Sequence, residues 1–146
     1  KRNKAMVWIQ KTVAVRAPKR GCHLITDQIT REIQQDLKRI KIGIAHFFIQ
    51  HTSASLTINE NYDRDVRTDM ESSLNHIVPE NQPYYRHTLE GSDDMPAHVK
   101  STLVGSSVTV PITDGQLNLG TWQGIWLCEH RTECSPRNIV ITINGE

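Results

Sequence analysis

The sequence contains few cysteines, and their spacing is not that of a disulfide framework. Cys22, Cys128 and Cys134 are an odd number, and no two of them form a CxxC pair. This pattern argues against paired disulfides and against a cysteine-bound structural zinc. We therefore expect the protein to work in a reducing, cytoplasmic environment.

Long hydrophobic runs and a strong excess of charge are also absent. No stretch of about 18 apolar residues occurs, and residues 1–4 lead into an alternating segment without the apolar core of a signal peptide. Charged residues make up 23% of the chain, yet the net charge is only +1. We expect neither a membrane nor a nucleic acid as a partner.

Three common catalytic fingerprints are missing as well. The chain has no GxSxG, no Walker loop and no GxGxxG. Their absence argues against a serine hydrolase, a P-loop NTPase and a Rossmann oxidoreductase.

The apolar pattern predicts a single α+β domain spanning residues 1–146, which is long enough for one sizeable core. Helical spacing of apolar residues predicts helices at 26–39, from Asp63 or Asp65 to the residues before Pro79, and at 96–104. Short β-type runs predict strands at 6–15, 42–51, 53–59, 107–112, 116–119, 124–129 and 138–144. This order favours a mostly antiparallel sheet, with a long ordered loop at 81–91.

Helix caps follow from the polar residues at the predicted helix starts. Thr26 or Asp27 is expected to cap the first helix, with Lys38 and Arg39 suiting its negative end. Asp93 or Asp94 is expected to cap the third helix, which Gly105 ends.

The first candidate site combines a histidine and two serines that are close in sequence at the end of a predicted strand. His51 precedes the small polar run that contains Ser53 and Ser55, whose hydroxyl and backbone N–H groups can receive phosphate oxygens. The alternative is a strand-end histidine beside ordinary surface serines.

A second group predicts a cation site. Helical spacing places Asp94 and His98 on one face, while His87 can approach from the preceding loop and Asp93 stands beside them. Imidazoles favour zinc and carboxylates favour magnesium, so the divalent ion stays open between these two. The alternative is an aspartate that only caps the helix, with His98 on the surface.

Two further segments combine aromatic and charged groups. Trp122 and Gln123 lie between glycines, which allows close backbone approach and a flat wall for a heteroaromatic ring. In the triplet 129–131, strand alternation sends Glu129 and Arg131 to one face and His130 to the other, with a surface salt-bridge ladder as the alternative. Cys128 and Trp126 are expected to be buried core residues.

Three of these segments together carry a resemblance to a known family. HTSASLTINEN at 51–61, EGSDDMPAHVKS at 90–101 and GTWQGIWLCEHR at 120–131 resemble the YjbQ-like secondary thiamine-phosphate synthase family, and the match runs nearly end to end. One departure is Cys128, which stands where the bacterial signature has glycine.

The resemblance implies a compact α+β domain with β-sandwich-like sheets and about three helices, assembled as a homotrimer with its site near the subunit boundary. It also implies thiamine-phosphate synthase activity, which the family's name calls secondary. In this reaction a thiazole phosphate nitrogen displaces pyrophosphate from a hydroxymethylpyrimidine diphosphate. The alternatives are a metal-dependent hydrolase of a phosphorylated metabolite and a non-catalytic trimeric protein that binds an anion or a metal.

The resemblance and this chemistry assign roles to the matched positions. Pyrophosphate departure needs charge neutralisation by a metal or cations, and the pyrimidine needs a stacking surface. The expected metal ligands are His51, His87, His98 and Asp93, and the cofactor is a divalent zinc or magnesium ion. The expected substrate-binding residues are Ser53, Ser55, Trp122, Gln123 and Arg131. The expected catalytic residues are His130, Glu60 and Asp94, with His130 as a proton shuttle.

Overall fold

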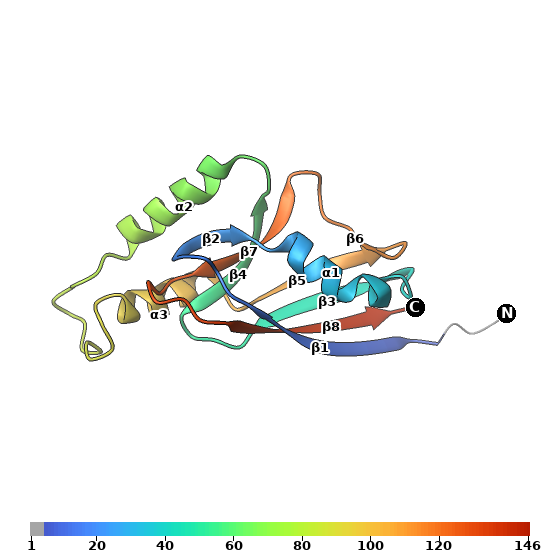
Figure 1. The fold of residues 1–146 in the computed structure, drawn as a ribbon, viewed down its shortest axis with the longest axis horizontal. Helices are drawn as coiled ribbons and strands as arrows, with labels where there is room; N and C mark the ends of the chain where they lie inside the picture. The colour runs from blue at the N-terminus through green and yellow to red at the C-terminus, as the bar shows by residue number, and fades with distance from the viewer. Residues whose placement is uncertain (1–4) are drawn as a thin grey trace.

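A computed structural model of the protein describes residues 5–146, which form eight strands and three helices (Figure 1). The strands are β1 (Val7–Val15), β2 (Gly21–Leu24), β3 (Ile42–Ile49), β4 (Ala54–Glu60), β5 (Ser107–Thr113), β6 (Gln116–Leu117), β7 (Gln123–Glu129) and β8 (Arg137–Gly145). The helices are α1 (Thr26–Leu37), α2 (Arg64–Ile77) and α3 (Asp94–Val104). All three helices and seven of the strands lie where the apolar spacing predicts them.

The strands form two antiparallel sheets. The five-stranded sheet has the order β1-β8-β3-β5-β6, and the three-stranded sheet has the order β2-β7-β4. Every strand pair in them is antiparallel. Figure 1 shows α2 running along the three-stranded sheet, on the side away from the five-stranded one. The predicted α+β class with sandwich-like antiparallel sheets is confirmed.

The main core fills the space between the sheets. Phe47 and Ile141 of the five-stranded sheet meet Leu56 and Leu127 of the three-stranded one, and α1 adds Ile33. Side chains alternate between the two faces of a strand, so one face of each sheet supplies this layer. Burying each such side chain contributes about 1.5–3 kcal/mol, which makes this layer the main support of the fold.

A second apolar cluster joins α2 and α3 to the outer face of the three-stranded sheet. Trp126 and Cys128 of β7 pack there with Cys22 of β2 and Leu74 of α2. Strand β7 is therefore buried on both faces, which explains its unbroken apolar run. Cys128 is a buried free thiol, as predicted, and its contact with Cys22 together with burial raises its pKa.

Two predictions about the start of the chain differ from the structure. No strand was predicted between residues 15 and 42, but Gly21 begins strand β2, which pairs with β7 in the register Cys22↔Cys128. Thr26 and Asp27 do not cap α1, because Ile25 is the cap residue and makes no side-chain bond. The hydroxyl of Thr26 instead accepts a hydrogen bond from Ile125 N at 2.8 Å, so tertiary contact replaces the cap.

The cap of α3 also differs from the expected form. The helix begins at Asp94, two residues earlier than expected, and its cap residue Asp93 makes no capping hydrogen bond. The preceding loop contains Gly91 at φ +103°, a conformation that favours glycine. This turn brings the loop back toward α3 and sets His87 beside its first turn. For α2, Asp63 caps the helix by accepting from Asp65 N, as predicted.

The three helices are shorter than a typical membrane-spanning helix. They contain 12, 14 and 11 residues, whereas a membrane-spanning helix needs about 20. Within residues 5–146 no helix combines the length and the apolar character that crossing a bilayer requires.

Candidate functional site

The first turn of α3 gathers two imidazoles around one carboxylate. Asp94 is only 4% exposed, and its Oδ2 lies 2.6 Å from His87 Nε2 and 3.1 Å from His98 Nε2. His98 follows one helical turn after Asp94, while His87 comes from the loop before the helix. We call these three residues the Asp94 cluster. Their candidate ligand atoms all lie within 4.8 Å of one another.

The hydrogen bonds of His98 fix the direction of its lone pair. Its Nδ1 lies 3.0 Å from the carbonyl oxygen of Thr52, which can only accept, so Nδ1 carries the proton. A neutral His98 therefore turns the lone pair of Nε2 toward the carboxylate of Asp94, which also offers only lone pairs. A proton or another cation must lie between them. A backbone carbonyl behind a ring nitrogen is also how metal-binding histidines are oriented.

Arg131 binds Asp94 Oδ1, the carboxylate oxygen that does not face the two histidines. Its guanidinium bonds Asp94 Oδ1 and, at 3.1 Å, Asp93 Oδ2, while Nη2 donates to Glu90 O at 3.0 Å. Asp93 Oδ2 also accepts from Thr132 N at 2.8 Å. Asp93 therefore ties the end of β7 to the start of α3, and its carboxylate is directed toward Arg131 instead of the two histidines.

Both aspartates are held as anions. Burial alone would raise the pKa of Asp94, but the hydrogen bond from His87 and the charges of His98 and Arg131 lower it below its ordinary value. For Asp93, burial is outweighed in the same way by bonds from Thr132 and Arg131, so its pKa is also lowered. In the form that can bind a metal, in which both imidazoles have lost their second proton, Arg131 and the two carboxylates sum to one net negative charge. The site thus suits a cation.

His51 belongs to a neighbouring buried ion pair. Arg137 donates to Glu129 at 2.7 and 2.9 Å in a two-pronged contact, and its Nη1 lies 2.7 Å from His51 Nε2. The other nitrogen of His51 faces Ser53 N at 2.9 Å. Burial and the charge of Arg137 lower the pKa of His51, so the ring is neutral. Both of its nitrogens face protein donors, and the structure does not bring His51 into the Asp94 cluster.

Glu129 and Arg137 are residues that the sequence reasoning missed as part of the site. The alternative of a surface salt-bridge ladder at 129–131 is wrong, because Glu129 is 0% exposed. A charged residue at the end of the apolar run 125–128 was the available signal, since such charges are buried only when paired. Nothing near Arg137 in the sequence marks it as the partner.

His130 and Ser55 form a separate buried pair. His130 Nε2 lies 2.9 Å from Ser55 Oγ, and both residues are buried on the side of the sheet that α2 and α3 cover. Burial and the charges of Lys100 and Arg20 lower the pKa of His130 to about 3. The ring therefore stays neutral near pH 7. The structure places Ser53, whose Oγ is 3.2 Å from His98 Nδ1, at the Asp94 cluster, but not Ser55.

Glu60, Trp122 and Gln123 lie at the other end of the β4–β7 pair. The register pairs Ala54 with Glu129 at one end and Glu60 with Gln123 at the other. Six residue steps of about 3.4 Å separate these ends by about 20 Å. Glu60 accepts from Tyr62 N and Gln123 from Gly120 N, so both side chains hold local turns. Trp122 is 61% exposed.

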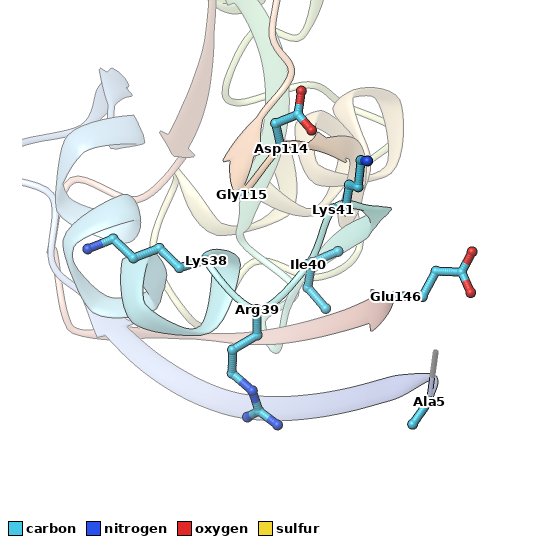
Figure 2. Close-up of a pocket in the computed structure, with 8 residues that line it drawn as sticks. All are labelled: Ala5, Lys38, Arg39, Ile40, Lys41, Asp114, Gly115 and Glu146. Carbon is cyan, nitrogen blue, oxygen red and sulfur yellow. The ribbon is translucent and has the colours of Figure 1, made fainter. Parts of the chain in front are cut away.

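A cavity opens beside the Asp94 cluster. It has a volume of about 630 Å³ and is lined by His51, Thr52, His98 and the end of α3. Small-molecule sites commonly fall in this size range. Another pocket of about 450 Å³ lies at the far edge of the molecule, but Figure 2 shows its Lys38, Arg39 and Lys41 side chains pointing in different directions. Of these two, the first cavity provides space for a ligand beside the cluster, because His98 belongs to both.

Comparison with known proteins identifies close relatives. The family model described as UPF0047 protein YjbQ-like matches residues 11–146. The UPF0047 protein YjbQ of Escherichia coli O157:H7 is 49% identical over 140 residues, which cover 96% of this chain and all of the relative. The UPF0047 protein YugU of Bacillus subtilis is 40% identical over 121 residues, covering 82% of this chain and 87% of the relative.

Solved structures extend the likeness to the fold. A YbjQ-like protein from Sulfolobus solfataricus P2 superposes with a TM-score of 0.84 at 27% identity, covering 97% of this chain and all of that one. A YjbQ/UPF0047 protein from Clostridium acetobutylicum superposes with a TM-score of 0.76 at 32% identity, and the match covers 92% of this chain and 98% of that one. The Sulfolobus protein is described as one of unknown function. These comparisons establish the family and the fold, and nothing in them ties the chain to a thiamine-phosphate synthase.

Proposed function

The chain belongs to the UPF0047 YjbQ-like family, whose members compared above carry no reaction in their names, and we propose from the chain's own geometry that it is a divalent-metal-dependent enzyme acting on a phosphorylated small molecule. The observation that carries this proposal is the convergence of His87 and His98 on the carboxylate of Asp94. The buried carboxylate is ionised, and the backbone carbonyl of Thr52 orients His98.

The donor set favours a zinc-like ion over magnesium. Two imidazole nitrogens and one carboxylate oxygen match three-ligand catalytic zinc sites, which keep further positions for water or substrate. Magnesium prefers a shell of oxygens, and only Asp94 among the three supplies one. When bound, the ion would supply Lewis acidity and a positive charge for phosphate oxygens.

The charge of the site argues against direct anion capture. Asp93 and Asp94 outnumber Arg131, and three of its five N–H donors already bind these two carboxylates and Glu90 O. An anion would meet net negative charge unless a cation had bound first. The proposal of a non-catalytic anion-binding protein is therefore the weaker one, and metal dependence is the property to test.

The most specific reaction within this proposal is thiamine-phosphate synthesis. The thiazole nitrogen would form a C–N bond to the pyrimidine methylene while the C–O bond to pyrophosphate breaks and the leaving group takes the electron pair. In one chain, however, the expected ring-binding residues Trp122 and Gln123 lie at the far end of β4 and β7 from the Asp94 cluster. The synthase proposal therefore needs these residues from another copy.

We accordingly keep the homotrimer as part of the synthase proposal. The outer face of the five-stranded sheet exposes the apolar side chains of Trp8, Ile44 and Phe48, which a second copy would cover. A mixture of His98→Ala and Trp122→Ala copies tests the shared site. Each variant alone would be inactive, whereas mixed trimers would regain a fraction of the activity. No recovery in trimers shown to be mixed would exclude a site shared in this way.

A metal-dependent phosphohydrolase is the second candidate. It needs no ring-stacking partner for a second substrate, and the single-chain cavity beside His98 contains no aromatic residue. The two candidates differ in products, since a hydrolase releases phosphate from one substrate without the thiazole.

The deciding experiment measures bound metal, pyrophosphate and thiamine phosphate with both substrates, with and without added zinc or magnesium. We expect metal-dependent turnover that His98→Ala abolishes. The matched control is His76→Ala, because His76 is an exposed histidine on α2. Equal thiamine phosphate and pyrophosphate would support the synthase, and phosphate release alone the hydrolase. Turnover that survives chelation and His98→Ala would overturn the proposal.

A further inference from the structure

A cleft rich in positive charge lies between the segment 18–24 and the first half of α2. Its volume is about 700 Å³, within the range of small-molecule sites. Four cationic side chains line it, namely Lys19, Arg20, Arg64 and Arg67, against the single carboxylate of Glu71. We call this the basic cleft. It shares no residue with the Asp94 cluster or with the cavity beside it.

Only one of the four cations is neutralised. Arg20 contacts Glu71 at 3.3 Å and Glu80 at 3.0 Å, and it donates to Asn75 at 2.7 Å. Lys19, Arg64 and Arg67 form no salt bridge with any of residues 5–146. The carboxylate of Glu71 is already engaged by Arg20, so the cleft retains an excess of positive charge.

Arg67 has a buried N–H donor for which the structure shows no hydrogen-bond acceptor among residues 5–146. Its Nη1 is buried and has no hydrogen-bond partner, which is costly for a charged donor. Glu71 Oε2, one turn further along α2, is also buried without a donor. Even if these two atoms paired with each other, Lys19 and Arg64 would remain uncompensated at the mouth of the same cleft.

The lining indicates the class of ligand. Guanidinium groups bind phosphate oxygens through two parallel hydrogen bonds, and three of the four cations are the guanidinium groups of Arg20, Arg64 and Arg67. The lining has no Phe, Tyr or Trp, and its one imidazole, that of His23, lies 2.7 Å from Lys19 O through Nε2, so charge is the main feature that the cleft offers a ligand. We propose that the basic cleft binds the di- or triphosphate group of a small molecule, recognised through its charge and oxygens.

The number of cations alone does not make such a site. The pocket in Figure 2 also contains three cationic side chains, Lys38, Arg39 and Lys41, but they diverge and share the pocket with Asp114 and Glu146. In the basic cleft the excess cations come from two segments, 18–24 and α2, that line one common volume.

Calorimetric titration with inorganic pyrophosphate and tripolyphosphate tests the proposal. The titrations are run in chelator, so that no divalent ion can bridge the anion to the Asp94 cluster. We expect saturable binding that weakens at least tenfold in Arg64→Gln/Arg67→Gln and falls as salt rises. The control Arg31→Gln/Arg39→Gln removes two exposed arginines from α1 and its C-terminal end and should bind like wild type.

Two further measurements keep the test independent of folding and of the proposed enzyme. Lys19→Gln changes the facing segment without touching α2 and should also weaken binding, while circular dichroism checks each fold. His98→Ala should bind both anions normally. The proposal is overturned if wild type shows no saturable binding, if the cleft variants bind like the control, or if His98→Ala removes the binding.

Discussion

Asp94 and His98 lie one turn apart on α3, with Asp94 Oδ2 3.1 Å from His98 Nε2, and His98 Nδ1 is committed to the carbonyl of Thr52. This relationship is what makes the start of α3 a candidate cation site, because two groups that offer lone pairs face each other when His98 is neutral. His87 brings a second imidazole from the preceding loop, with Nε2 2.6 Å from the same carboxylate oxygen. Asp93, which precedes Asp94 in the sequence, instead accepts hydrogen bonds from Arg131 and Thr132.

Exchanging each aspartate for asparagine should therefore separate the two roles. Asp94→Asn removes a charged ligand atom, and we expect zinc affinity to fall at least 100-fold. Asp93→Asn weakens the contacts to Arg131 and Thr132, and we expect a loss of stability of about 1–3 kcal/mol with a smaller loss of zinc affinity. Titration calorimetry and urea unfolding measure the two effects. The reverse pattern, with zinc lost only in Asp93→Asn, would contradict the assignment.

The buried His130 should make the fold sensitive to acid. Its pKa is about 3 in the folded protein against 6.5 for a free histidine, so between these values the unfolded chain binds more protons. Stability from this group is complete above pH 6.5 and is lost as the pH falls toward 3. From neutral pH to about pH 4.5, we expect wild type to lose about 2–3 kcal/mol.

Urea unfolding at several pH values checks the His130 prediction. His130→Gln should flatten the dependence in this window, whereas the exposed control His76→Gln should leave it unchanged. The aspartates with lowered pKa titrate below this window and add their own loss only at lower pH. An unchanged slope in His130→Gln would assign the acid sensitivity to another group.

The Glu129–Arg137 pair should behave as a buried salt bridge. Glu129→Gln leaves the guanidinium of Arg137 buried without its counterion, and we expect a loss of about 3–5 kcal/mol. Glu129→Gln/Arg137→Met removes both charges and should recover part of this loss. The partly exposed Lys11–Asp36 pair is the comparison, since Lys11 is 39% exposed and Lys11→Gln should cost less than about 1 kcal/mol. Equal losses in the single and double variants would show that the charge pairing is not the cause.

The sequence predicted those elements in which apolar residues recur at one clear spacing. Each helix has apolar residues at helical spacing, as Ile29, Ile33 and Leu37 illustrate in α1, and each was found. Strand β2 was missed because GCHL is short, begins with glycine and gains its structure only from the register with β7. The caps of α1 and α3 differed because Thr26 and Asp93 bond distant parts of the chain, which no local pattern records.

The candidate site was predictable only in its local part. Asp94 and His98 were linked by helical spacing, and His87 was placed nearby as a loop residue. By contrast, Arg137 reaches His51 across 86 positions of the sequence, and this contact depends on how the two sheets pack. The distance between Trp122 and the Asp94 cluster likewise follows from strand register, which residue types alone do not specify.

The outer face of the five-stranded sheet gives the last prediction, which concerns assembly. Trp8 and Ile44 flank Asn144 on neighbouring strands, and no helix covers them. A stable interface needs at least about 1,000 Å² of buried surface with apolar residues at its centre, and a broad sheet face can supply it. Ile44→Asp/Phe48→Asp should therefore convert the proposed trimer to monomer.

The side chains of Ile44 and Phe48 point away from the core, so the monomeric Ile44→Asp/Phe48→Asp variant should keep its secondary structure. Light scattering after gel filtration measures the mass, and circular dichroism checks the fold. Leu89→Asp is the control, because Leu89 is 98% exposed in the loop before α3 and lies outside this face. If the sheet-face variant keeps the wild-type mass, the copies associate elsewhere. If wild type is itself monomeric, Trp122 of one copy cannot complete the site of another, and the single-substrate hydrolase becomes the stronger proposal.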